Sequence, residues 1–264
     1  MSRVTSSSDA LPTGTFSLNS TYGRRAIALS IAAAVGGFLF GFDSSVVNGA
    51  VESIQSDFAL NDFVTGFIVA IALLGCAVGA LTAGNLADRW GRLRVMFLGA
   101  VMFFISAIGT GLAFSVWDLG LWRVVGGIGI GIASVVAPAY IAEVAPRQIR
   151  GGLASLQQLA ITIGIFAALL SDAMLEGIAG GADSVLWLGL DAWRWMFLVA
   201  VIPAAVYGIL SFTVPESPRY LISKGRNDEA RQFIEMDSPI KEITLTYLRQ
   251  LNWVQRITNI PTLD

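Results

Sequence analysis

The sequence contains no histidine, only one cysteine and few charged residues. Without histidine there can be no histidine-based catalytic triad, histidine metal site or histidine proton relay. The single cysteine, Cys76, lies inside an apolar run, which excludes a disulfide-stabilised secreted scaffold. Only 14% of the 264 residues are charged, against about 25% in soluble domains. These shortages exclude a soluble enzyme, and the net charge of −2 gives no sign of nucleic-acid binding.

Long apolar runs take the place of the missing charge. Six stretches of 21 to 25 residues contain only two charged side chains between them, and about 20 apolar residues cross a bilayer as a helix. We therefore predict an all-α membrane protein with six transmembrane helices embedded in the lipid bilayer, without metal or cofactor. The stretches are Ala26–Ala50, Phe63–Ala87, Val95–Trp117, Leu119–Ala142, Gly151–Ser171 and Trp195–Pro215.

The basic residues predict which side of the membrane each loop faces, because Lys and Arg accumulate in cytoplasmic loops. Fifteen of the 17 lie before the first stretch, after the last, or in the loops after the second and fourth. The opposite loops hold eight acidic residues and a single basic one, Arg194. We therefore predict that both ends of the chain are cytoplasmic. Residues 1–24, rich in Ser and Thr, are interpreted as a disordered tail and 25–217 as the membrane region.

The two charged side chains inside the stretches have opposite signs and lie at similar depths. Asp43 is about 10 Å and Arg123 about 6 Å from the outer end of its stretch, at a rise of ~1.5 Å per residue. Their similar depths allow the two side chains to meet, and an isolated charge in a membrane is costly. Two roles remain open: a structural salt bridge (or an arginine that snorkels to the headgroups), and a proton-coupling pair in which the aspartate binds a proton when it leaves the arginine.

Four motifs stand at the boundaries of these stretches. They are Gly41–Gly49, Gly84–Arg92, Pro138–Pro146 followed by Arg150 and Gly151, and Pro215–Leu221. With all four in order, the chain resembles the sugar porters of the major facilitator superfamily over roughly Ala26–Glu235. The resemblance implies two halves of six helices with the substrate bound between them, and this chain corresponds to the N-terminal half.

The region after the sixth stretch corresponds to the family's cytoplasmic link between the halves. We interpret 218–264 as this inter-half helical segment, truncated, and Asn227 as an N-cap that predicts a short helix over about Asn227–Glu235. No seventh stretch follows. The missing partner is therefore either a C-terminal six-helix half or a second copy of the chain.

Charged residues at the cytoplasmic helix ends are implied to form the inner gate. In the family, such carboxylates and guanidinium groups form salt bridges that lock the gate when the carrier faces outward. The corresponding residues are Asp88, Arg89, Arg92, Glu143, Arg150, Glu216 and Arg219. The alternative interpretation is solvated loop charge that only sets topology. Leu93 departs from the family, which commonly has a second arginine at that place.

Two adjacent amides, Gln157 and Gln158, are candidates for sugar binding. An amide suits a polyol because it offers both a donor and an acceptor to neighbouring hydroxyls. Adjacent helical residues point about 100° apart, so only one of the two is expected to face a central cavity. The resemblance places the sugar-contacting glutamine at Gln158. Phe40 is a further candidate, packing against a pyranose face, and for all three residues helix packing is the alternative.

The resemblance implies a sugar transporter of the plasma membrane, and a bacterial inner membrane is favoured. With Asp43 present, it implies proton-coupled symport of a monosaccharide or polyol by alternating access. A facilitative uniporter and a half-sized carrier acting as a homodimer remain alternatives. A further alternative, from another class, is a sugar sensor or regulator that transports nothing.

Overall fold

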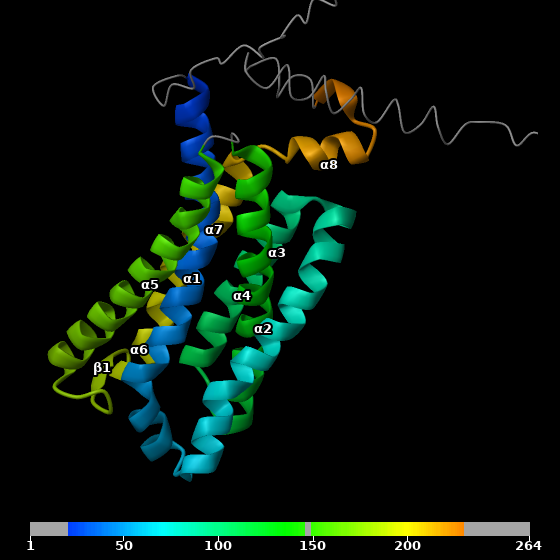
Figure 1. Cartoon of the computed structure of the whole chain (residues 1–264). Coiled ribbons are helices and arrows are strands. Elements are labelled where there is room, and N and C mark those ends of the chain that lie inside the picture. The colour runs from blue at the N-terminus through cyan, green and yellow to red at the C-terminus, as the bar shows by residue number, and fades with distance from the viewer. Residues whose placement is uncertain (1–20, 146–148, 230–264) are drawn as a thin grey trace, which may run out of the picture.

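The computed structural model describes residues 21–145 and 149–229 as a bundle of long helices (Figure 1). The predicted tail up to residue 20 and most of the predicted segment 218–264 lie outside the described residues. Six helical segments are long and apolar enough to cross a membrane, which confirms the all-α fold with six spans. The first five helices are α1 (Thr21–Asp57), α2 (Asp62–Trp90), α3 (Arg92–Gly111), α4 (Val116–Val144) and α5 (Arg150–Ala179).

The sixth span differs from the expected single helix because it is divided in two. Helix α6 (Ala192–Val199) and helix α7 (Val201–Thr213) meet at Ala200. The cause is Pro203, which has no N–H to donate and whose ring crowds the carbonyl four residues earlier. A last short helix, α8 (Pro218–Ser223), follows. Residues 227–229 are helical, with Asn227 inside the helical segment, and the rest of the predicted helix to Glu235 lies outside the described residues.

The segment between the fifth and sixth spans also differs from the expected loop. Helix α5 runs to Ala179, so Asp172, which we expected in the loop, is helical and buried. The chain then forms a two-stranded antiparallel hairpin from β1 (Val185–Trp187) and β2 (Leu190–Asp191) before it enters α6. We call residues 185–191 the outer hairpin.

Helices α1 and α4 form the centre of the bundle, with α5 along α1, and α2 and α3 along α4. Glycines make these seams tight. A Cβ on Gly41 would overlap the carbonyl oxygen of Ile161 on α5, and one on Gly131 would overlap that of Cys76 on α2. Small residues of this kind let helix backbones approach closely in lipid, where no hydrophobic force drives helices together.

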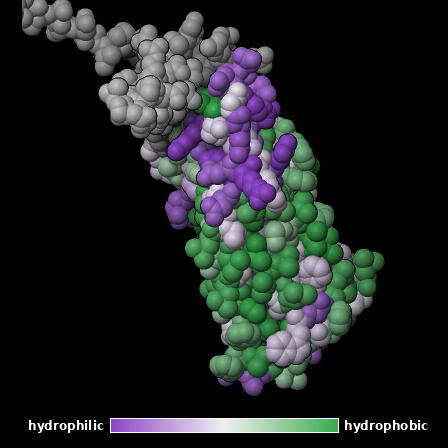
Figure 2. All heavy atoms as spheres, turned by 90° about the vertical axis from the view of Figure 1, so that its right-hand side faces the viewer, coloured by the Kyte–Doolittle hydropathy of each residue, from purple (hydrophilic) through white to green (hydrophobic). Residues whose placement is uncertain are grey.

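The two ends of the bundle differ in polarity. Figure 2 shows hydrophilic side chains gathered at one end and a broad hydrophobic band below it. We call the end that carries α8 the inner end and the opposite one the outer end, following the predicted orientation. Within the membrane spans, α2 and α5 are the least covered by the rest of the described chain, so their apolar sides face outward from the bundle.

Candidate transport site and inner-end network

Asp43 and Arg123 meet inside the bundle, as their similar depths allow. Nη1 of Arg123 on α4 donates to Oδ1 of Asp43 on α1 at 2.7 Å. The side chains are only 6% and 14% exposed, respectively. The guanidinium also lies over the ring of Phe197 on α6, 5.7 Å from its centroid, a favourable cation–π arrangement. The pair is thus a neutral unit that links the two central helices.

Beside this pair, a small cavity lies between α1, α2, α4 and α6, toward the outer end. Arg123 and Thr65 are its polar lining residues, and its other walls are apolar. The apolar lining residues are Val47, Val51, Ile54, Ile68, Val69, Leu119 and Phe197. The guanidinium therefore has Asp43 as its partner and an almost entirely apolar surrounding.

The three sequence candidates for sugar contact lie in different environments. Gln158 is exposed on α5, and Phe40 is half-buried in α1. Gln157 is turned toward α1: its Nε2 lies 2.7 Å from where a Cβ on Gly37 would be, and its Oε1 is buried without a hydrogen-bond partner. As expected for adjacent residues, the two glutamines point in different directions. Ser44 and Asn48, one and two turns beyond Phe40, are exposed on the same helix.

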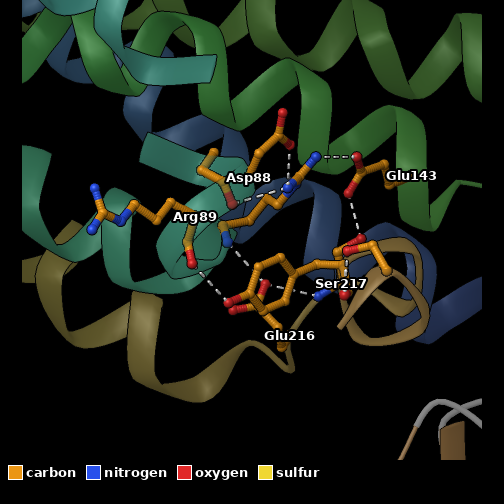
Figure 3. Close-up of polar contacts among 9 residues, drawn as sticks. Asp88, Arg89, Glu143, Glu216 and Ser217 are labelled. Atoms are coloured by element: carbon orange, nitrogen blue, oxygen red, sulfur yellow. Dashed lines mark hydrogen bonds and ion pairs between the residues drawn. The ribbon is translucent and has the colours of Figure 1, made fainter. Parts of the chain in front are cut away.

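At the inner end, Arg92 connects three helices (Figure 3). Its guanidinium binds Oδ1 of Asp88 on α2 at 2.9 Å and Oε1 of Glu143 on α4 at 3.0 Å. It also donates to the carbonyl of Ala87 at 3.0 Å. Arg92, Asp88 and Glu143 are therefore brought together, as the resemblance implied.

Glu216 joins this network through the backbone rather than through a salt bridge. Its Oε1 accepts from the backbone N–H of Arg92 at 2.9 Å and from that of Ser217 at 3.0 Å. A carboxylate at the start of α3 satisfies a free N–H and stabilises the positive end of the helix dipole. Gly91 allows this approach, because it has a φ of +99° and a Cβ there would overlap the Glu216 carboxylate.

Three uncharged partners of the network were not predicted from the sequence. Ser217 donates to Oε2 of Glu143, Tyr140 donates to the carbonyl of Pro215 at 2.9 Å, and Tyr220 to that of Arg89 at 3.3 Å. All three residues lie inside motifs that the sequence displays. The charged members of the motifs can be recognised from residue type, because a charge near a membrane needs a partner. The role of a hydroxyl group becomes clear only when its neighbours in the fold are known.

The remaining gate candidates are not part of the network. Arg89 and Arg219 are exposed, and neither forms an ion pair with any residue that the structure describes. Figure 3 shows the Arg89 side chain extending away from the cluster. Arg150 begins α5, and its side chain lies outside the described part of the chain.

A second arginine, Arg194, connects segments at the outer end and was not among the site residues predicted from the sequence. It binds the carboxylate of Asp57 at 3.2 Å and the carbonyl of Ala113 at 2.6 Å. Its guanidinium lies 4.4 Å from the centroid of the Trp193 ring. The signal for this role was its isolation as the one basic residue among eight acidic ones on that side.

Comparison with known proteins defines the family. The model of the sugar (and other) transporter family matches residues 29–251. The glucose transport protein of Synechocystis sp. is 52% identical over 227 residues, which are 83% of this chain and 48% of that protein. The D-xylose-proton symporter of Escherichia coli is 39% identical over 239 residues, covering 80% of this chain and 47% of that protein.

The fold agrees with the sequence match. A solved structure of the proton:xylose symporter XylE bound to 6-bromo-6-deoxy-D-glucose superimposes with a TM-score of 0.73 at 36% identity, over 79% of this chain and 49% of that one. The chain is therefore a member of the sugar transporter family within the major facilitator superfamily. It spans about half the length of the relatives it matches.

Proposed function

We propose that this chain supplies the N-terminal half of a proton-coupled sugar carrier that works by alternating access. The buried Asp43–Arg123 pair is the observation that carries the proposal. In such a half, six helices form one wall of a substrate cavity, and a second body is needed to rock against it. A C-terminal six-helix half is the proposed second body, with 218–264 as the link and both ends of this half in the cytoplasm.

Proton coupling follows from the chemistry of the pair. Asp43 is stable as a carboxylate in this apolar setting while Arg123 neutralises it at 2.7 Å. When a change of conformation separates them, a proton is the cheapest replacement for the lost positive charge. Binding and release of one proton then accompany each separation and reunion.

Sugar is proposed to bind on the open side of α1 and α5, with Gln158 as the principal contact. Its exposed amide supports this assignment, whereas the burial of Gln157 against Gly37 supports a packing role for that residue. Phe40 remains a weaker candidate. Relatives named as glucose, xylose and arabinose transporters support a monosaccharide as substrate, and bacterial hosts among them support a bacterial inner membrane.

The inner-end network is proposed as half of the cytoplasmic gate. Arg92, Asp88, Glu143 and Glu216 already bind one another in this half. Arg89 and Arg219, which are exposed and without ion-pair partners among the described residues, are the members proposed to reach across to the second body when the gate closes. The side chain of Arg150 is assigned to the gate on the motif alone.

The experiment is the Asp43→Asn substitution in the carrier encoded by the complete gene, read beyond codon 264 and reconstituted in proteoliposomes. We expect loss of sugar accumulation against a gradient and retention of sugar exchange, because the amide cannot exchange a proton. Asp62→Asn, at the exposed start of α2, is the matched control and should retain both uphill accumulation and exchange. Uphill accumulation by the Asp43→Asn carrier would contradict the coupling role.

The same proteoliposomes separate the alternatives. Sugar-induced alkalinisation outside the vesicles is expected of the symporter. If the gene ends at codon 264 and the chain alone still gives this signal, a homodimeric carrier replaces the proposal. Sugar flux without a pH change indicates a uniporter, and sugar binding without any flux indicates a sensor.

A further inference from the structure

The turn of the outer hairpin contains a leucine in a backbone conformation that leucine rarely adopts. Leu188 has a φ of +56° and Gly189 a φ of +76°, the pattern of a tight hairpin turn that favours Asn-Gly. The Leu188 side chain is 88% exposed and touches almost nothing in the protein. Neither backbone preference nor packing therefore accounts for an apolar side chain at this tip.

The hairpin is fixed to the bundle at the level where the sixth span begins. Nε1 of Trp195 donates to the carbonyl of Trp187 at 3.1 Å, and the two indole rings pack edge to face at 5.5 Å. Trp195 is the fourth residue of the span Ala192–Thr213, so it lies about 4.5 Å inside the span by the helical rise. Figure 1 shows the hairpin beside α6 at the outer end. Trp187 is thus held beside the outer end of the sixth span.

Other exposed aromatic side chains surround the outer end at the same boundary. Phe63 is the second residue of α2, and Phe114 and Trp117 flank the start of α4; all three are more than three-quarters exposed. Tryptophan collects at the membrane–water interface because its ring has an apolar body and a polar N–H, and exposed phenylalanines beside it add apolar surface at the same end. The hairpin therefore continues an apolar belt that the rest of the outer end already forms.

We propose that the outer hairpin is an interfacial anchor whose tip, Leu188, inserts among the lipids of the leaflet at the outer end. The charged side chains near the outer hairpin indicate which lipid headgroups it would contact. Asp183 precedes the outer hairpin and Asp191 is its last residue, and Arg194 is paired with Asp57 and Asp191. Uncharged or zwitterionic headgroups fit this surface better than anionic ones, and the contact is apolar rather than electrostatic.

A probe at the tip measures this insertion in the chain reconstituted in phosphatidylcholine nanodiscs. In a Cys76→Ala background, Leu188→Cys carries the fluorophore NBD, and Ala59→Cys, in the turn between α1 and α2, carries it as a control. We expect quenching by a lipid with a nitroxide near its headgroup to be several-fold stronger at 188 than at 59. Bleaching by aqueous dithionite should show the opposite order.

A substitution without a label tests the same inference through stability. Leu188→Asn relieves the backbone strain but removes the apolar tip, whereas Ala59→Asn relieves strain at a second exposed site with positive φ, +50°. We expect the melting temperature in nanodiscs to fall for Leu188→Asn and to rise for Ala59→Asn. A rise for both would place the tip in water and overturn the proposal. A probe at 188 shielded from both lipid nitroxide and dithionite would also overturn it, because another protein surface would then cover the tip.

Discussion

A single residue, Arg92, forms many of the polar contacts that hold the inner end of the bundle together. It binds two carboxylates on different helices and a carbonyl, while its own backbone N–H is held by Glu216. We expect Arg92→Ala to lower the free energy of unfolding by about 2–3 kcal/mol, because it leaves the largely buried carboxylate of Glu143 without its charged donor.

Arg89→Ala is the matched control for that substitution. Arg89 has the same side chain three residues earlier, is exposed, and has no ion-pair partner among the described residues. We expect a change within about 0.5 kcal/mol. Thermal unfolding in one detergent measures both variants, and equal losses for the two would show that the network does not stabilise this half.

Contacts in the candidate site could be predicted from the sequence where the side chains are charged and their depth in the membrane follows from position along one apolar stretch. The meeting of Asp43 with Arg123 followed from two depths along apolar helices, because one charge in a membrane needs another. The bond from the Arg92 backbone to Glu216 was not predictable, since it joins positions 124 residues apart. Nor did any periodicity indicate that Gln157 would be buried against Gly37.

At the scale of elements, the seam between α1 and α5 depends on residues without side chains. We expect Gly41→Ala to destabilise the bundle by about 1–3 kcal/mol, since the added methyl group would overlap the backbone of Ile161. Gly66→Ala on α2 meets nothing within 4 Å and should be neutral or slightly stabilising, as Ala favours helix. Reversible unfolding in mixed micelles would measure the difference, and a neutral Gly41→Ala would mean that the helices separate easily.

The elements themselves were predicted better in number than in extent. Six apolar runs correspond to six spans, because hydrophobic length is decided locally. The two additional turns of α5 were missed since Asp172 and Glu176 end the apolar run without ending the helix. The break at Ala200 was marked in the sequence by Pro203, but Pro138 shows that a proline in α4 leaves its helix continuous.

At the scale of the whole molecule, the orientation in the membrane is the property to test. The charge distribution predicts that the inner end faces the cytoplasm. In intact cells and a Cys76→Ala background, a membrane-impermeant maleimide should label Ala59→Cys, in the turn between α1 and α2, and leave Asp228→Cys unlabelled until the cells are lysed. Both positions are exposed, so the reverse pattern would show an inverted topology.

The two arginines at opposite ends of the bundle have a mechanical consequence. Arg92 holds α2, α3 and α4 together at one end, and Arg194 holds α1 and the turn between α3 and α4 to α6 at the other. A bundle whose helices are held together at both ends is expected to move as one rigid body, with little bending inside it. If the proposed alternating access is correct, spin labels placed at the two ends of the bundle will keep their separation during transport, and the tilt of the bundle will be measurable only against a label outside it.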